Sequence, residues 1–135
     1  MTILNDIRAT LDGHLASVAG LPAIAYENAK FTPTPGTAYL STTLFLTSRR
    51  PAVRGPSPQH RYQGLYQVTV HTPQEDGTGA AFDFADAVMA AFDGSTNVAG
   101  PSVTVSLMFS ETGTQVTRPP FYMLPVQIGW YIYAQ

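Results

Sequence analysis

The stretch AYLSTTLFLTSRRPAVRGPSPQHRYQGLYQVTVH, residues 38–71, decides the fold of this chain. Its first part alternates, with one side formed by Leu40, Thr42, Leu44 and Leu46 and the other by Tyr39, Ser41, Thr43 and Phe45. The last ten residues, from Tyr62 to His71, alternate again. Alternation with period two is typical of a strand that buries one face. Two such runs around one connection predict a long antiparallel hairpin.

The connection between these runs holds four of the seven basic residues of the chain, Arg49, Arg50, Arg54 and Arg61. Prolines and a glycine between Pro51 and Pro58 exclude a helix or an interior strand there. A connection of more than about 12–15 residues is typical of a functional or a disordered segment. We therefore expect a basic hairpin arm at about 47–64 that contacts a partner. A solvated loop without a partner is the alternative that composition leaves open.

Two segments show the three- and four-residue spacing of amphipathic helices. The first carries an apolar stripe of Leu4, Ile7, Leu11, Leu15 and Val18, with Thr2 as its cap and Gly20 at its end. The second runs from Thr78 to Asp93, stops at Gly94, and places Phe82, Phe84 and Phe92 in the expected core. Its remaining face carries Asp83, Asp86 and Asp93, which we interpret as a solvated stripe or, in a second hypothesis, an acidic partner face.

The remaining segments read as strands. A short one is expected at 23–26, and Val103, Val105, Leu107 and Phe109 alternate with serine and threonine before a turn at 111–114. The run from Tyr122 to Ile132 has one continuous apolar face, and Pro125 within it indicates an edge position or a bulge. The order is α-β-β-β-α-β-β-β. It predicts one α+β domain over 1–135, with a mainly antiparallel sheet and both helices packed on one face.

Composition limits the classes of function. The chain of 135 residues has a net charge of -2, and only 12% of its residues are charged. Such a chain has no overall positive electrostatic field that would attract a polyanion. Its charge-poor surface is compatible with self-association. Cysteine is absent, which excludes disulfides and thiolate chemistry. No export signal or long apolar run is present, so we expect a soluble product made in the cytoplasm, with no membrane partner.

The sequence carries no recognisable active site. Its three histidines, His14, His60 and His71, fall on a helix, a loop and a strand end, and phosphate, dinucleotide and nucleophile-elbow motifs are absent. The carboxylates of Asp83 and Asp86 are too few for a cation site. We expect no enzyme activity, no cofactor and no metal. His71 acting as a base, with a partner that the sequence does not supply, is the remaining enzyme hypothesis.

Several segments together carry a resemblance to a known class of proteins. They are ILNDIRATLDGHLASVAGLPAIAYEN (3–28), FTPTPGTAYLSTTLFL (31–46), RYQGLYQVTVHTP (61–73), GTGAAFDFADAVMAAFDG (77–94) and PVQIGWY (125–131). In this order they resemble the tail terminator, or tail-completion, proteins of long-tailed bacteriophages and prophages, including the minor tail protein U type. The resemblance covers 3–131 and rests on structural residues, so it transfers no functional residue.

The resemblance implies a structural virion protein without a cofactor. Tail terminators are α+β subunits that form a homohexameric ring, cap the tail tube, end its elongation and provide the surface that joins tail to head. The implied partners are further copies of the chain, the tail-tube protein and the head–tail connector or neck proteins. The implied locations are the virion tail and, during assembly, the bacterial host cytoplasm. Two alternatives stay open: a head-completion or neck protein of the same virion, and a nucleic-acid-binding module that uses the arginine arm.

Overall fold

The computed structural model describes residues 2–34, 36–53, 55, 59–73, 77–93, 97–100 and 103–134. These residues form two helices, α1 (Ile3–Ala16) and α2 (Gly79–Ala91), and one seven-stranded sheet. The strands are β1 (Ala23–Ala25), β2 (Tyr39–Val53), β3 (Gln59–Pro73), β4 (Asn97–Ala99), β5 (Thr104–Thr112), β6 (Val116–Arg118) and β7 (Phe121–Ala134). The α+β class and the mainly antiparallel sheet are therefore confirmed.

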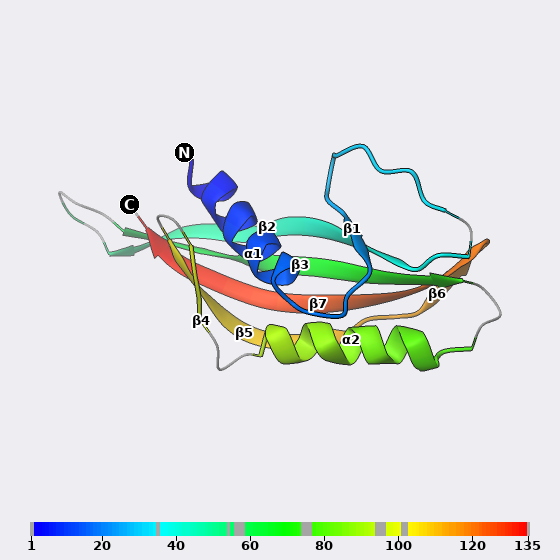
Figure 1. Cartoon of the computed structure of the whole chain (residues 1–135). Coiled ribbons are helices and arrows are strands. Elements are labelled where there is room, and N and C mark those ends of the chain that lie inside the picture. The colour runs from blue at the N-terminus through cyan, green and yellow to red at the C-terminus, as the bar shows by residue number, and fades with distance from the viewer. Residues whose placement is uncertain are drawn as a thin grey trace.

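Three long strands form the centre of the sheet (Figure 1). The order is β1-β2-β3-β7-β5-β4, with β6 paired to β7 beside the end of β5. β1 joins β2 in parallel, and every other pairing is antiparallel. The predicted hairpin is the β2–β3 pair, in which Tyr39 lies opposite His71 and Arg50 lies opposite Arg61.

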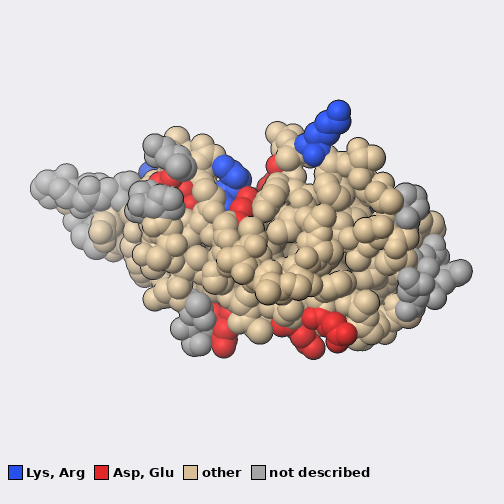
Figure 2. Space-filling view, in the orientation of Figure 1, with Lys and Arg blue, Asp and Glu red and all other residues tan. Residues whose placement is uncertain are grey.

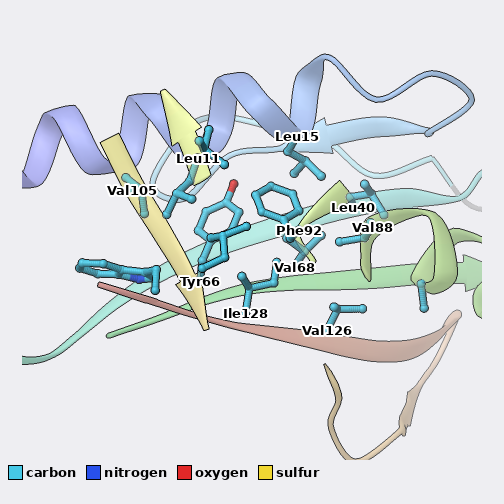
Figure 3. Packing of buried hydrophobic residues seen from close by; sticks show 14 of the residues in the cluster. Leu11, Leu15, Leu40, Tyr66, Val68, Val88, Phe92, Val105, Val126 and Ile128 are labelled. Carbon is cyan, nitrogen blue, oxygen red and sulfur yellow. The ribbon is translucent and has the colours of Figure 1, made fainter. Parts of the chain in front are cut away.

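Both helices cover the same face of the sheet, as the order of elements predicts. α1 contributes the buried side chains of Ile7, Leu11 and Leu15, and α2 contributes those of Ala81, Ala85, Val88 and Phe92. They pack on alternate residues of β3 and β7, among them Tyr66, Val68, Ile128 and Trp130, which are fully buried. Figure 3 shows the rings of Tyr66 and Phe92 side by side between α1 and the sheet; their centroids are 5.8 Å apart. This face is the hydrophobic core, and we call it the helix face.

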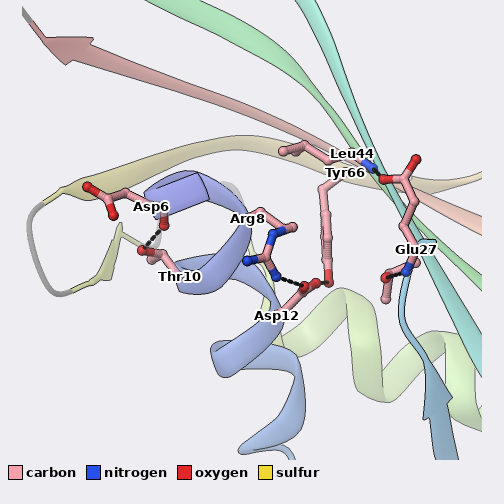
Figure 4. Close-up of polar contacts among 8 residues, drawn as sticks. Asp6, Arg8, Thr10, Asp12, Glu27, Leu44 and Tyr66 are labelled. Carbon is pink, nitrogen blue, oxygen red and sulfur yellow. Dashed lines mark hydrogen bonds and ion pairs between the residues drawn. The ribbon is translucent and has the colours of Figure 1, made fainter. Parts of the chain in front are cut away.

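Polar contacts tie α1 to the rest of the core. Thr2 caps the helix, as predicted, by accepting a hydrogen bond of 3.4 Å from the Asn5 amide. The buried Tyr66 hydroxyl donates to Asp12, whose carboxylate also lies 3.4 Å from Arg8 (Figure 4). His14 Nε2 lies 2.7 Å from the Ala91 carbonyl oxygen, at the end of α2. These contacts fix α1 against both β3 and α2.

The hairpin is more regular than the sequence predicts. β2 continues to Val53 and β3 begins at Gln59, so most of 47–64 is paired strand rather than loop. Pro51 is tolerated because β1 pairs only with 39–41, which leaves the far half of β2 at the edge of the sheet. Figure 1 shows both strands reaching past the helices. The predicted contact residue Arg54 and the helix stop at Gly94 lie outside the described residues.

Expectations about several single residues are wrong. Phe82 was expected in the core, but 43% of its surface is exposed, because it lies on the outer side of α2. Pro125 was expected at an edge or a bulge, but β7 is an interior strand. The pairings of β7 with β6 and with β5 both stop next to Pro125, between Met123 and Val126. The missing amide N–H of Pro125 therefore leaves no backbone carbonyl of a paired strand without its hydrogen bond.

Phe109 is the third correction, and its cause is a bulge. The alternation of 103–109 predicts that Phe109 shares a face with Leu107. The β5–β7 register shifts between these two residues, so Leu107 lies opposite Trp130 on the helix face while Phe109 lies opposite Gly129. An extra residue moves every following side chain to the other face. Phe109 is therefore 39% exposed on the opposite side of the sheet. The short strand β4 is a further element that the sequence pattern did not predict.

Candidate assembly surface

The arginines of the hairpin arm lie on both faces of the sheet. Arg49 lies opposite Tyr62, a core residue, and so projects on the helix face. Arg50 lies opposite Arg61 on the face that no helix covers in the described part of the chain; we call this the open face. The described arm residues therefore form two separate contacts rather than one basic cluster.

Arg61 lies flat along the open face. Its guanidinium carbon is 4.8 Å from the centroid of the Tyr131 ring, within the range of a cation–π contact. The same guanidinium donates to the Gln63 side chain and approaches the Met108 sulfur at 3.9 Å. Tyr131 in turn meets Tyr133 edge to face, at 5.9 Å between centroids. These contacts hold the positive charge of Arg61 in a fixed position beside two tyrosines.

A hollow opens beside this arginine. It has a volume of about 380 Å³ and is lined by Thr47, Ser48, Arg50, Arg61 and Gln63. Arg50 is exposed at its rim. On the helix face, Arg49 donates to the Tyr62 hydroxyl at 2.9 Å, and its guanidinium lies 5.4 Å from that ring. The hollow therefore brings together two guanidinium groups, the exposed one of Arg50 and the anchored one of Arg61.

The predicted acidic face lies on the outer side of α2. Asp83, Asp86 and Asp93 are all exposed, whereas Ala81, Ala85 and Val88 point into the core. Figure 2 shows acidic side chains gathered along the lower edge of the molecule, where Figure 1 places α2. The acidic stripe and the hairpin arginines thus belong to different regions of one subunit, and contact between them requires a second copy.

The one histidine that sequence analysis considered as a base has a partner in the structure. His71 Nε2 lies 2.9 Å from Ser41 Oγ, at a hollow of about 440 Å³ that is also lined by Glu27 and Tyr39. His71 is buried and stacks on Tyr39, with ring centroids 4.2 Å apart. Burial lowers the pKa of His71 from 6.5 to about 4, so the ring is neutral near pH 7. Stacking and burial are those of a structural side chain that fixes the end of the hairpin.

Two kinds of site are absent from the described residues. Within them, no group of three or more histidine, cysteine or acidic side chains is arranged to hold a metal ion. No helix among them is long and apolar enough to cross a membrane.

Sequence analysis did not single out the exposed apolar side chains of the open face. Phe45, Leu65, Gly129 and Phe109 are consecutive cross-strand neighbours on β2, β3, β7 and β5. Phe45 is 46% exposed, and Tyr133 further along β7 is 55% exposed. A signal was present in the sequence, since Phe45 and Tyr133 alternate with core residues and so had to lie on the second face. Phe109 gave no such signal, because its position depends on the bulge.

Comparisons with known proteins agree with this architecture. The sequence profile of a family described as "Phage tail terminator protein" matches residues 6–130. The fold is similar to that of a solved chain with 24% sequence identity and a TM-score of 0.72, covering 98% of this chain and 96% of the other. It is also similar to a chain in a structure titled "Virion of native gene transfer agent (GTA) particle", with 15% identity, a TM-score of 0.67 and coverage of 98% of both chains.

No curated protein matched in a search by sequence. The two solved structures establish the fold alone, because their sequence identities are low. The family profile covers nearly the whole chain, from the first turn of α1 to the core tryptophan of β7. The chain therefore belongs to the phage tail terminator proteins, a family of virion structural proteins.

Proposed function

We propose that this chain forms a ring, with six copies as the family resemblance implies, that caps the tail tube, ends its elongation and provides the surface for joining the head. The observation that carries the proposal is the family match over 6–130. The whole chain would act as one terminator domain, with the tail-tube protein and the neck proteins as partners. It would take its place in the virion tail after synthesis in the host cytoplasm.

Molar mass measured by light scattering tests this proposal. The chain is measured over a range of protein concentration and salt, alone and then with purified tail-tube protein. Formation of a species of about six copies, alone or only with the tube, is the result that the resemblance implies. A strict monomer that ignores the tube protein contradicts the proposal.

The hairpin arm is our proposed contact with the neighbouring subunit or with the tube. Arg50 and the arm residue Arg54 carry charge on a proline-containing segment, while Arg49 and Arg61 are held by tyrosines. Charge complementarity at the rim of an interface sets register and association rate more than affinity. Replacing Arg49, Arg50 and Arg54 with serine should weaken assembly and reduce its dependence on salt, without changing the circular dichroism spectrum. Unchanged assembly at matched salt would show that the arm is not part of the interface.

In this proposal the chain performs no catalysis, and the Ser41–His71 pair is structural. A neutral histidine next to a serine can act as the general base that activates a serine nucleophile, so the pair needs its own test. Ser41→Ala removes the hydroxyl that His71 would activate in a serine mechanism at this hollow. We expect it to leave ring assembly and tube capping intact. Loss of capping with an unchanged ring would point to chemistry at this pair.

One observation favours a second candidate function. Arg61, Tyr131 and Tyr133 form a cation–aromatic group on the open face, and tyrosines with arginines are typical of surfaces that stack nucleic-acid bases. The net charge of -2 speaks against a dedicated role of this kind. Titration with single-stranded DNA decides between the functions: steep salt-dependent binding that is lost in Arg61→Gln supports this candidate.

A further inference from the structure

The open face presents an apolar row with a basic end. The row of Phe45, Leu65, Gly129 and Phe109 crosses four strands. The Phe109 ring lies directly over Gly129: a Cβ added there would be 2.3 Å from Phe109 Cε2. Toward the hairpin, Gln63 and Tyr131 come next on this face, and Arg50, Arg61 and Tyr133 follow in the row after them. Toward the other end, they include Gln67 and Gln127, which face each other across β3 and β7.

The outer side of α2 has complementary chemistry. Phe82 is 43% exposed, and Asp86 follows one turn later on the same side of the helix. Asp83 is exposed beside them. This stripe combines one large apolar side chain with negative charge, whereas the open face combines large apolar side chains with positive charge. Complementary charge of this kind favours the correct pairing and disfavours like-charged pairings.

The length of α2 also matches the width of the apolar row. α2 has 13 residues, and a helix of that length spans about 20 Å. Four strands spaced about 4.8 Å apart cover roughly 15 Å between the outer backbones. One helix therefore fits across the row from β2 to β5. Helix-on-sheet packing of this kind already forms the core on the helix face, and a second helix would cover the open face in the same way.

We propose that the open face of one copy receives α2 of a second copy, with Phe82 against the apolar row and Asp83 and Asp86 toward Arg50 and Arg61. The two surfaces lie on opposite sides of the sheet, so one copy cannot satisfy both by itself. The contact is therefore heterologous, and its repetition closes a ring if the rotation per copy allows. This inference rests on the proposed ring and names the surfaces that build it.

Site-directed cross-linking tests the contact. Because the native chain has no cysteine, only the introduced residues can form a disulfide. Two single variants, Phe82→Cys and Phe45→Cys, the latter in the apolar row and 46% exposed, are purified separately and oxidised alone and as a mixture, with tail-tube protein added if assembly requires it. We expect a disulfide-linked dimer in the mixture and none in either variant alone. The double variant should give a ladder of longer linked species. Leu4→Cys, 45% exposed on α1, mixed with Phe45→Cys is the matched control and should not link.

A charge exchange supplies the second readout. Arg50→Asp and Asp86→Arg should each raise the concentration for half-assembly about tenfold, as expected for loss of about 1.4 kcal/mol. Combining both substitutions in one chain should restore assembly, because the opposite charges then meet again with exchanged signs. Both residues are exposed, so neither substitution disturbs the core.

The outcomes separate this inference from the proposed function. Ring assembly without a Phe82–Phe45 link, and without rescue by the charge exchange, overturns the inference and leaves the ring in place. Dimers of Phe45→Cys alone would show an isologous contact between two open faces, which also overturns it. A chain that stays monomeric with and without tube protein contradicts both the inference and the proposed function.

Discussion

Close contacts of single glycines determine where the sheet tolerates no side chain. A Cβ added at Gly64 would lie 1.9 Å from the Phe45 carbonyl oxygen and 2.9 Å from Trp130 Cζ2. The first of these is backbone, which cannot move aside without disturbing the hairpin. We predict that Gly64→Ala lowers the free energy of unfolding by about 1–3 kcal/mol, as overpacking does, measured by urea denaturation.

Gly13 is the control for this substitution. It lies in α1 with no atom within 4 Å of an added Cβ. Gly13→Ala should raise stability by up to about 1 kcal/mol, because alanine is the better helix former. Equal effects of the two substitutions would mean that Gly64 is not closely packed.

His71 gives the fold a dependence on pH. Its pKa is lowered by burial from 6.5 to about 4, so the unfolded chain takes up a proton on this ring before the folded chain does. Stability is therefore complete above pH 6.5 and falls as the pH decreases toward 4, by up to about 1.4 kcal/mol per pH unit. Burial also raises the pKa of Asp12, which acts in the opposite direction at lower pH.

The His71→Gln variant isolates this effect, since it keeps a hydrogen-bonding group toward Ser41 and cannot become charged. We predict that the difference in unfolding free energy between wild type and variant shrinks or reverses between pH 6.5 and 4. A constant difference over this range would show that His71 titrates normally in the folded protein.

At the level of residues, the sequence predicts faces correctly only until a bulge occurs. The alternation of 38–46 would continue to place Arg50 on the helix face and Arg49 on the open face. The register shift between Leu46 and Ser48 reverses both positions. The same happens to Phe109 in β5. A bulge depends on pairing between distant strands, so no local pattern reveals it, and the arrangement of the candidate surface could not be read from the sequence.

Among the elements, α1 depends on a polar tie to β3 as well as on its apolar stripe. The Tyr66 hydroxyl donates to the buried Asp12 carboxylate, and burial raises the pKa of Tyr66, which keeps it the donor. Tyr66→Phe leaves that carboxylate oxygen without its donor. We predict a loss of about 1–3 kcal/mol in the free energy of unfolding.

The matched control is Tyr133→Phe, which removes a hydroxyl from a side chain that is 55% exposed. It should change the free energy of unfolding by less than about 0.5 kcal/mol, as for other surface substitutions. If both variants unfolded at the same urea concentration, the Tyr66–Asp12 contact would contribute little to holding α1.

Long periodic elements were the ones that the sequence predicted well. The helix α1, the hairpin of β2 and β3, and the strand from Tyr122 were all confirmed, because each is specified by many consecutive residues. Of the apolar stripe predicted for α1, Ile7, Leu11 and Leu15 are buried, but Leu4 is 45% exposed in the first turn and Val18 lies beyond the end of the helix. β4 was missed because its pairing covers only Asn97, Val98 and Ala99. The hairpin arm was expected as a loop because proline usually ends a strand, and an edge position removes that restriction.

For the whole molecule, the distribution of charge matters more than its sum. The net charge is only -2, yet the exposed acidic residues of α2 and the arginines of the hairpin lie in separate regions. If these regions meet between copies, salt should weaken assembly. The Debye length, over which charges act on each other, falls from about 10 Å at 0.1 M salt to about 3 Å at 1 M. Sedimentation velocity across this range should show smaller species at high salt. Stronger assembly at high salt would indicate an interface held by apolar contacts alone.

Tube length is the most direct measure of termination. Purified tail-tube protein is allowed to polymerise with increasing amounts of this chain, and tube lengths are measured by electron microscopy. The account predicts that mean length falls as the ratio of chain to tube protein rises, with density for a ring at one end of each tube. Tubes that keep their length at every ratio, with no added density at either end, would contradict the assignment as a cap that ends elongation.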